Sequence, residues 1–458
     1  MKLFKLAILA VSTIFLFTGC SEDTQSPEQL AKKPIYNEEK EILYKGINQL
    51  LPQNSSLILP SNSKEVGKIN KVDLNGDRVK ELIVFEKKEN LNDNTNEVGF
   101  MILSESENEY TDKGNILQEG DSIEYANFYD LDNDGNKEII LVIKENDTTY
   151  MHIYNFVDDE IKKICSYGSE WIENSEDFHD MKVKIGYVDD DNILDILILN
   201  LNPKNNEMYA SIVNFDKNIK LKDYVKFENV KNLNNSYITI DNVAKLTKDK
   251  MVKGVILDIP NIKDNTYITQ ILYLKDGKLY KAFSDYDRNI AKAYYIPAED
   301  INKDGIIDIP IVVGTGNTYN IKSSVNTSWY RWNGKMDESS GLLFTSQIYY
   351  SYQYNYKLLI PNNLVNKIII EPEYSNDNVL FKFYYYDIVN GKPKKLFTIS
   401  AENKVVADDS KGTGTKTTTV LEETEDYRFV LYPNNIKEME RLDITNSALR
   451  EYFSLIYE

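Results

Sequence analysis

Hydrophobic and polar positions alternate with a period of two over most of the chain, which is typical of strands rather than helices. Stretches such as "YMHIYNFV", "MKVKIGYV" and "SYITIDNV" place apolar residues at every second position. Between them lie short continuous aliphatic runs such as "EIILVI", which we expect to be strands buried on both faces. The pairs Asp276–Gly277 and Asn390–Gly391 favour tight hairpin turns. The pattern predicts an all-β chain.

The strand pattern repeats along the chain. Four acidic loops, each followed by an aliphatic strand, begin at Asp73, Asp130, Tyr187 and Asp300. The steps between them are 57, 57 and 113 residues, and the last is about twice the others. A missing copy is therefore expected near position 244, where the chain keeps Asp249 and an aliphatic run but not the other acids. A sixth eroded copy fits "KLLIPNNLVNKIIIEPEY" around Leu359.

Four strands in each repeat of about 57 residues are typical of the blade of a β-propeller rather than of a sandwich or a solenoid. We therefore predict a single β-propeller domain of six or seven blades over residues 37–458. The segment "NEEKEILYKGINQLL" has helical spacing and should precede the first blade. At the other end we expect a hairpin in "TTTVLEETEDYRFVLYP", then a helix capped by Thr445 or Asn446. The hairpin either completes a seventh blade or closes the ring.

The N-terminus predicts export. Residues 1–19 contain two lysines and then an uncharged apolar run that is too short to span a bilayer, as in a signal peptide. The ending "LFTGC" resembles the lipobox of bacterial lipoproteins, although Phe17 departs from it. This resemblance implies that Cys20 becomes a diacylated N-terminus; the alternative is a secreted protein with a chance cysteine. Residues 20–36 are polar and aperiodic, as in a flexible tether, so we expect an extracytoplasmic location on the bacterial cell membrane through the lipid anchor alone.

Charge and cysteine content limit the possible partners. The 458 residues carry a formal net charge of −19, which argues against binding nucleic acid or anionic lipid and suits the collection of divalent cations. Cys165 is the only cysteine besides Cys20, so no disulfide can form within the mature chain, and a small buried hydrophobe is its simplest role. We expect a monomer.

The acidic loops have the ligand spacing of a calcium site. In the second loop, positions 1, 3, 5 and 9 are carboxylates, position 6 is Gly135, and position 7 offers a backbone carbonyl. These ligands are Asp130, Asp132, Asp134, Asn136 (carbonyl) and Glu138. Oxygen-only ligands exclude zinc and copper, and flexible high coordination favours Ca²⁺ over Mg²⁺. Position 12 is Leu141 and the flanks are strands, so the loop is not an EF-hand.

Three other loops share the spacing to different degrees. The last loop repeats it in full with Asp300, Asn302, Asp304, Ile306 (carbonyl) and Asp308. The first loop has Asp73, Asn75, Asp77, Val79 (carbonyl) and Glu81, but Arg78 replaces glycine. The third loop keeps Asp189, Asp191 and Asp195 but has Tyr187 and Asn192 at positions 1 and 6, so weak or no binding is expected. Two calcium ions are therefore predicted, and at most four; the alternative is that the acids only form turns.

The pattern D-x-[DN]-x-D-G-x-x-[DE] between two strands, repeated at blade spacing, resembles the FG-GAP or VCBS repeats of integrin-α-like β-propellers. The resemblance covers roughly residues 65–405. Many bacterial surface lipoproteins contain such repeats. The resemblance implies a propeller in which calcium ions brace the loops between strands.

Few residues suggest catalysis or a ligand surface. The only histidines are His152 and His179, and neither adjoins a nucleophile motif, so both are interpreted as structural. The segment "IYYSYQYNY" could place Tyr350, Tyr352, Tyr354 and Tyr356 on one face of an extended strand, as a sugar or peptide surface. The alternative is that these tyrosines fill the interfaces between blades.

Three functions remain open from the sequence. The first is a non-enzymatic surface lipoprotein whose calcium-braced propeller binds a protein or glycan, as in adhesion. The second is a polysaccharide lyase or hydrolase on the same scaffold, which the scarcity of histidine disfavours. The third is a structural role in assembly of the cell envelope.

Overall fold

The computed structural model describes residues 38–90, 95–106, 109–172, 178–284, 287, 290–293, 295–312, 324–374, 378–386, 391–404 and 418–457. The predicted signal peptide, Cys20 and the tether lie outside these residues. The described residues form six antiparallel sheets of four or five strands. The predicted all-β propeller fold of six or seven blades is thus confirmed, with six.

The first four sheets follow the predicted repeat. Sheet 1 contains β1 (Ser55–Leu57), β2 (Ile69–Val72), β3 (Glu81–Asn90), β4 (Thr95–Ser106) and β5 (Glu109–Glu119). Sheet 2 contains β6 (Ser122–Tyr129), β7 (Glu138–Glu145), β8 (Thr148–Val157) and β9 (Glu160–Tyr167). Sheet 3 contains β10 (Asp180–Gly186), β11 (Asp195–Asn202), β12 (Glu207–Phe215) and β13 (Ile219–Phe227). Sheet 4 contains β14 (Tyr237–Thr247), β15 (Lys250–Pro260), β16 (Tyr267–Lys275), β17 (Lys278–Lys281) and β18 (Ala291–Lys292).

The last two sheets are formed by the C-terminal part of the chain, from Ile309 onward. Sheet 5 contains β19 (Ile309–Val312), β20 (Ser324–Trp332), β21 (Leu342–Ser351), β22 (Tyr356–Leu359) and β28 (Phe453–Leu455). Sheet 6 contains β23 (Ile368–Tyr374), β24 (Asn378–Tyr386), β25 (Pro393–Asn403), β26 (Thr419–Glu423) and β27 (Tyr427–Pro433). Among the described residues the helices are α3 (Glu38–Leu50), α5 (Ile436–Arg441) and α6 (Asn446–Tyr452), with short 3₁₀ turns η3 (Tyr352–Tyr354) and η4 (Asn362–Leu364).

The aliphatic runs are continuous because the second strand of an inner sheet, such as β7 or β11, packs against both neighbouring sheets. In β7, Ile139 and Leu141 join the core shared with sheet 1, whereas Ile140 and Val142 join the core shared with sheet 3. Alternate side chains of a strand point to opposite faces, so burial on both sides requires an unbroken apolar run. The same division recurs in β11, where Ile196 and Leu197 belong to different cores.

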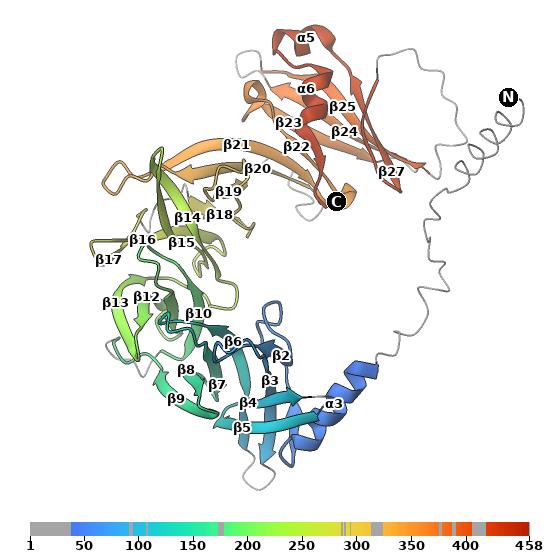
Figure 1. Cartoon of the computed structure of the whole chain (residues 1–458). Coiled ribbons are helices and arrows are strands. Elements are labelled where there is room, and N and C mark those ends of the chain that lie inside the picture. The colour runs from blue at the N-terminus through green and yellow to red at the C-terminus, as the bar shows by residue number, and fades with distance from the viewer. Residues whose placement is uncertain are drawn as a thin grey trace, which may run out of the picture.

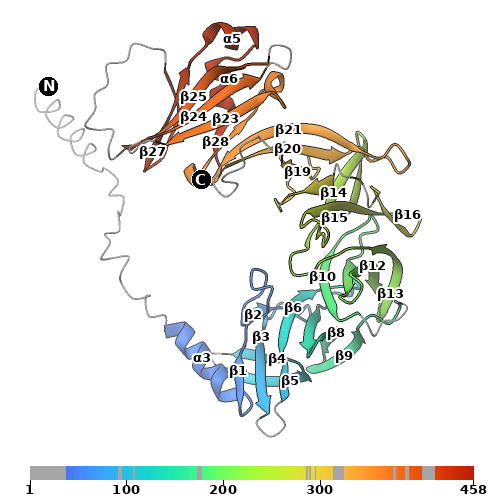
Figure 2. The same cartoon turned by 180° about the vertical axis from the view of Figure 1, so that it is seen from behind.

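The six sheets follow one another along an open arc, with sheet 1 at one end and sheet 6 at the other (Figures 1 and 2). Helix α3, which the sequence predicted, packs Ile47 against Leu82, Val84 and Met101 on the face of sheet 1 that points away from sheet 2. A helix therefore covers the face that a last blade would have to meet in a closed ring.

The sixth predicted copy is paired differently from a blade. Strand β22 was expected to precede β23 in one sheet, but it pairs with β21, with Ile348 opposite Leu359. Similarly, β18 pairs with β16 of sheet 4 rather than with β19. The predicted C-terminal hairpin is β26–β27, and β27 pairs with β25. The hairpin therefore completes sheet 6; it neither forms a seventh blade nor closes the ring among the described residues.

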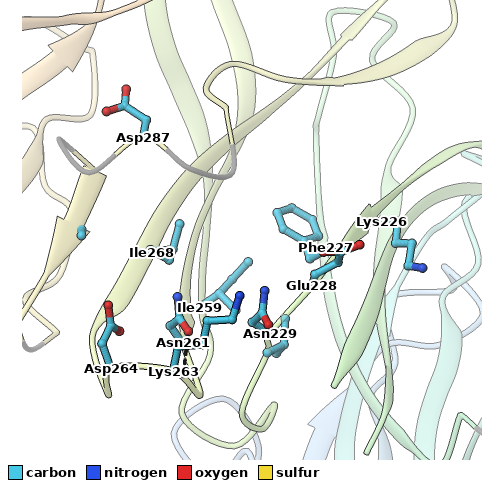
Figure 3. Close-up of a pocket in the computed structure, with 12 residues that line it drawn as sticks. Lys226, Phe227, Glu228, Asn229, Ile259, Asn261, Lys263, Asp264, Ile268 and Asp287 are labelled. Atoms are coloured by element: carbon cyan, nitrogen blue, oxygen red, sulfur yellow. Dashed lines mark hydrogen bonds between the residues drawn. The ribbon is translucent and has the colours of Figure 1, made fainter. Parts of the chain in front are cut away.

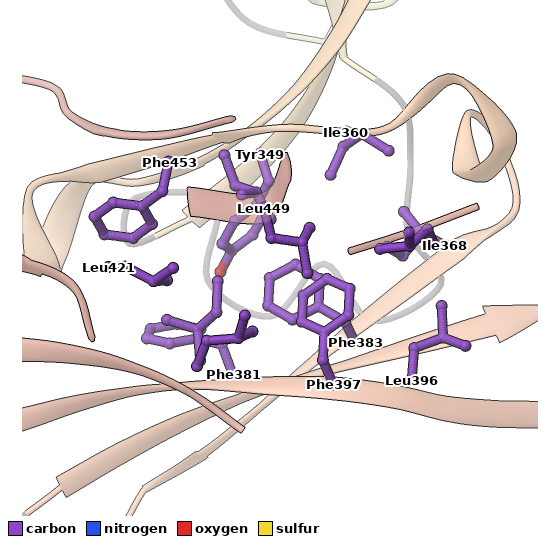
Figure 4. Close-up of a cluster of buried hydrophobic side chains, with 14 of the residues drawn as sticks. Tyr349, Ile360, Ile368, Phe381, Phe383, Leu396, Phe397, Leu421, Leu449 and Phe453 are labelled. Atoms are coloured by element: carbon purple, nitrogen blue, oxygen red, sulfur yellow. The ribbon is translucent and has the colours of Figure 1, made fainter. Parts of the chain in front are cut away.

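An aromatic core joins sheet 6 to sheet 5 and to the C-terminal helices. Figure 4 shows Phe381, Phe383 and Phe397 of sheet 6 with Tyr349 of β21 and Phe453 of β28. Figure 4 also shows Leu449 of α6 in this group.

Both C-terminal helices begin with a side-chain cap. The Asn435 side chain accepts a hydrogen bond from Glu438 N, and the Thr445 side chain accepts one from Ala448 N. The sequence predicted a cap at Thr445 or Asn446, and Thr445 is the residue that caps α6; helix α5 was not predicted.

Candidate functional site

The Asp130 loop brings three carboxylates together between β6 and β7. Asp130, Asp132 and Glu138 each offer an oxygen within 4.8 Å of the others. Asp130 accepts hydrogen bonds from Asp134 N and Gly135 N, both at 3.1 Å, and Gly135 has φ 96°, which only glycine adopts easily. One oxygen of Asp132, Oδ1, is buried and accepts no hydrogen bond. This donor set fits a hard divalent cation.

Burial of the carboxyl groups in the Asp130 loop and repulsion between them disfavour their ionised forms when no cation is bound. Glu138 is 2% exposed and accepts a hydrogen bond from Leu131 N at 2.9 Å. Burial, reinforced by the charge of Asp132, raises the pKa of Glu138 to about 7. Burial and the neighbouring Asp134 also raise the pKa of Asp132. A bound cation would reverse both effects because it favours the ionised carboxylates.

The Asp189 loop has the same convergence of carboxylates but already contains a cation. The ammonium of Lys222 lies 3.0 Å from Asp189, 2.9 Å from Asp191 and 2.9 Å from Asp195. Lys222 sits at a bulge between β12 and β13, and the equivalent bulge between β8 and β9 carries Ile164. Burial alone would lower the pKa of Lys222, but the hydrogen bonds that its ammonium donates to the three carboxylates outweigh burial and raise the pKa. A side chain therefore occupies the place of a metal ion in this loop.

The Asp300 loop is intermediate between the Asp130 loop and the Asp189 loop, because a side-chain cation contacts some of its carboxylates. Asp300 accepts hydrogen bonds from Asp304 N at 3.1 Å and from Gly305 N at 2.7 Å, as in the second loop. Asp308 is fully buried, and burial raises its pKa against the opposing effects of Thr345 and Arg331, whose Nε lies 3.8 Å from Asp308 Oδ1. However, Arg331 Nη1 lies 2.7 Å from Asp304 Oδ2. The two loops with complete sequence patterns are therefore not equivalent, because an arginine competes with a cation here.

The Asp73 loop tolerates its arginine better than the sequence suggests. Arg78 adopts φ 73° in place of glycine, its backbone N–H donates to Asp73 Oδ2 at 3.0 Å, and its side chain is exposed. Asp73 Oδ1 is buried without a hydrogen bond, and Glu81 accepts one from Leu74 N at 2.9 Å. Burial raises the pKa of Glu81. This loop resembles the Asp130 loop in its unpaired buried oxygen.

Residues at position 7 of three loops make the same turn contact. The amides of Val79, Asn136 and Ile306 donate to the carboxylate two residues earlier, at 2.7, 2.8 and 3.1 Å. Such contacts also stabilise acidic turns without an ion. The unpaired buried oxygens, rather than these contacts, distinguish a metal loop from a simple turn.

The predicted tyrosine surface does not form. Tyr350 lies in β21, Tyr352 and Tyr354 lie in η3, and Tyr356 begins β22, so the segment is not one extended strand. Tyr356 is fully buried and Tyr350 is 7% exposed. Asn355 has φ 53° at the turn, which reverses the chain within the segment. Tyr350 and Tyr356 are core residues, as the alternative interpretation held, whereas Tyr354 is partly buried and Tyr352 is exposed.

The surroundings of His152 and Cys165 indicate structural rather than catalytic roles. His152 is buried on β8, and its Nδ1 lies 2.8 Å from Ser166 Oγ. Burial, with the charge of Lys163 as a smaller cause, lowers the pKa of His152 to about 4. Burial raises the pKa of Cys165 to about 11, so its thiol is a poor nucleophile.

A pocket that the sequence pattern does not predict lies on the concave side of the arc. We call it the inner pocket; it has a volume of about 390 Å³. Strands β6, β10 and β14, which lie on the inside of the arc (Figures 1 and 2), and the segment before β2 supply its lining. The polar and aromatic lining residues are Ser61, Asn62, Glu65, Glu124, Tyr125, Lys182, Lys184, Asn234, Ser236 and Tyr237.

A second pocket of about 460 Å³ lies between sheets 3 and 4 (Figure 3). Figure 3 shows Phe227, Ile259 and Ile268 in its apolar part. Its rim carries both charge signs, with Lys226 and Glu228 from sheet 3 and its following turn. This mixed rim favours no particular ligand charge.

No protein-family model matches the chain, and no curated protein matches it. Similar solved structures include the exotype rhamnogalacturonan lyase YesX, at 10% identity and a TM-score of 0.31, covering 76% of this chain and 69% of that chain. Another is the β-propeller domain of the Trilobed protease from Pyrococcus furiosus, at 12% identity and a TM-score of 0.26, covering 74% and 90%. A protein from Lactobacillus plantarum matches at 8% identity and a TM-score of 0.29, covering 73% and 86%. These scores carry no conclusion about activity, so the fold assignment rests on the sheet order.

No helix in the part of the chain that the structure describes has the length and apolar character needed to cross a membrane.

Proposed function

We propose that this protein is an extracytoplasmic lipoprotein, anchored to the bacterial cell membrane through Cys20, whose calcium-braced propeller binds a glycan or a protein. The observation that carries the binding function is the inner pocket. Three sheets and the segment before β2 meet there, and most of its lining residues are polar or aromatic. Small-molecule sites commonly combine such a concave shape with a few convergent polar groups.

The calcium component rests on the Asp130 loop. Its carboxylates converge within 4.8 Å, and Asp132 Oδ1 is buried without a hydrogen-bond partner. The Asp73 loop shares the unpaired oxygen, and Asp308 supports a site in the Asp300 loop that Arg331 weakens. In this arrangement Ca²⁺ supplies no chemistry; it neutralises the loop and ties the end of one strand to the start of the next. These features are consistent with kinship to the FG-GAP or VCBS repeats.

The lipid anchor is supported by the sequence of residues 16–20. Cells expressing the protein and fed a radioactive fatty acid should label it, and the Cys20→Ser variant should lose the label and leave the membrane fraction. Retention of both label and membrane association by Cys20→Ser would overturn the anchor.

The binding function is tested by screening the purified full chain, in mild detergent, against a glycan array and an extract of surface proteins. We expect saturable binding to one class. The same glycans, incubated with the protein, should remain intact. Unsaturated or shortened sugar products would instead support the polysaccharide lyase or hydrolase alternative, and the absence of any saturable binding would support a purely structural role.

A further inference from the structure

The two lysines of the inner pocket have different partners. Lys184 Nζ lies 2.9 Å from Glu65 Oε1, so its charge is matched across the pocket between sheet 3 and the segment before β2. Lys182 Nζ instead donates to two backbone carbonyls, Ser236 O at 2.7 Å and Leu233 O at 3.3 Å. No carboxylate among the described residues forms an ion pair with Lys182.

In this arrangement the positive charge of Lys182 has no anionic partner, and one donor hydrogen of its ammonium remains available for a ligand. An ammonium has three donor hydrogens, and two carbonyls satisfy only two of them. Burial lowers the pKa of Lys182, which reflects the cost of holding the charge without an anion beside it. A ligand anion would supply the missing partner.

A second polar group in the pocket is also unmatched. Tyr125 on β6 is 7% exposed, and its hydroxyl is buried and makes no hydrogen bond of good geometry, with Asn127 and Tyr129 as its polar neighbours. Burial is the main cause that raises the pKa of Tyr125, so the hydroxyl stays neutral and can donate. A buried hydroxyl that makes no hydrogen bond costs free energy, which a ligand oxygen would recover.

Polar groups on the β6 side of the pocket are already paired, and this pairing disfavours an extended peptide. The Asn62 side chain bonds both Ala126 N and Ala126 O, at 3.0 and 2.8 Å, and Ser61 N donates to Ile123 O at 2.9 Å. These contacts occupy the free edge of β6. A peptide that binds as an added strand needs such an edge, whereas a compact polar ligand does not.

We propose that the inner pocket binds a carboxylate-bearing sugar, whose carboxylate accepts from Lys182 and whose hydroxyl groups meet Tyr125. This inference rests on the proposed binding function and specifies its ligand and its site. Because the chain has a net charge of −19, long-range forces repel an acidic glycan. The attraction must therefore come from direct contact with Lys182.

Calorimetric titration of the full chain with three uronate tetrasaccharides, made of galacturonate, mannuronate or hyaluronan units, tests the proposal. Each is paired with its methyl ester, which keeps the sugar and removes the charge. We expect at least one acid to bind, and its ester to bind at least tenfold more weakly. If esters and acids bind equally, or if only neutral glycans or acidic peptides bind, the carboxylate-sugar proposal fails while the binding function stands.

Two variants locate the site. Lys182→Met and Tyr125→Phe should each weaken binding of the acid at least fivefold. Tyr125→Phe removes only an unpaired hydroxyl, so its melting temperature should not fall, which guards against a folding defect. Lys220→Met, on the exposed outer strand of the same sheet, is the control and should bind normally. Wild-type affinity in both Lys182→Met and Tyr125→Phe would place the ligand elsewhere; no saturable binding of any glycan or protein by the wild type would overturn the proposed function itself.

Discussion

Lys222 and Ile164 occupy equivalent bulges in neighbouring sheets, and the choice between them decides how an acidic loop is neutralised. Lys222 contacts three carboxylates of the Asp189 loop, all within 3.0 Å. Beside the Asp130 loop, Ile164 leaves the carboxylates without a side-chain cation. The repeat therefore keeps the acidic loop and fills it with either an ammonium or, as we propose, a calcium ion.

Replacing Lys222 with isoleucine should convert the Asp189 loop into a calcium loop. Without calcium, Lys222→Ile leaves three carboxylates uncompensated, one of them buried, and should destabilise the fold by about 3–5 kcal/mol. With calcium, the stability should largely return and the number of bound ions should rise by one, as measured by calorimetric titration.

Lys220→Ile is the matched control for Lys222→Ile. Lys220 is exposed and pairs only with Asp216, so its replacement should change neither stability nor stoichiometry appreciably. An unchanged number of bound calcium ions in Lys222→Ile would show that the lysine does not stand in for a metal.

His152 should make stability depend on pH. The folded state lowers its pKa to about 4, whereas the unfolded chain has the ordinary value of 6.5. Between these values the unfolded state binds more protons, so stability is complete above pH 6.5 and is lost as the pH falls toward 4. At pH 5 the loss due to this group is about 2 kcal/mol.

Urea unfolding at pH 8 and pH 5 measures this effect. The decrease in the unfolding free energy should be smaller by about 2 kcal/mol in His152→Gln than in the wild type, since the carboxylates contribute equally to both. An equal decrease in the two proteins would mean that the imidazole is not held neutral.

At the scale of elements, the repeat predicted sheets 1 to 4 because each loop and its aliphatic run recur at nearly fixed spacing. The repeat predicted the wrong pairing partner for β22, because strand pairing also depends on packing. Tyr356 and Leu358 of β22 are buried in the core shared with sheet 6. The predicted tyrosine surface does not form because Asn355, a residue type that tolerates the left-handed conformation, makes a turn within the tyrosine-rich segment. Lys222 could not be recognised from sequence because it reaches Asp189 from 33 residues away through a bulge.

Helix α3 should be a stabilising cover for the first sheet. Ile47 is fully buried against β3 and β4, whereas Ile42 on the same helix is 47% exposed. Ile47→Ala should lower the unfolding free energy by about 2–5 kcal/mol, because it leaves a cavity, and Ile42→Ala by less than about 0.5 kcal/mol. Similar effects of the two substitutions in urea unfolding would show that α3 does not cover sheet 1 in solution.

At the scale of the whole molecule, the propeller blades form an arc in which adjacent sheets share hydrophobic cores (Figure 1). Its first end is covered by α3. The other end is closed by the aromatic core of sheet 6 with α6 (Figure 4). The inner pocket lies where β6, β10 and β14 meet the segment before β2, so the ligand site depends on how these sheets are held together. Ions that tie the loops of sheets 1 and 2 would therefore support the pocket as well as the fold.

Thermal unfolding of the full chain in calcium and in chelator tests the central claim most directly. The account predicts that the melting temperature rises by several degrees in millimolar Ca²⁺, since an ion that binds only the folded state stabilises it by mass action. Mg²⁺ should have a much smaller effect, and Asp132→Asn should lose much of the calcium response. A melting temperature that is the same in calcium and in chelator would contradict the account and leave the acidic loops as simple turns.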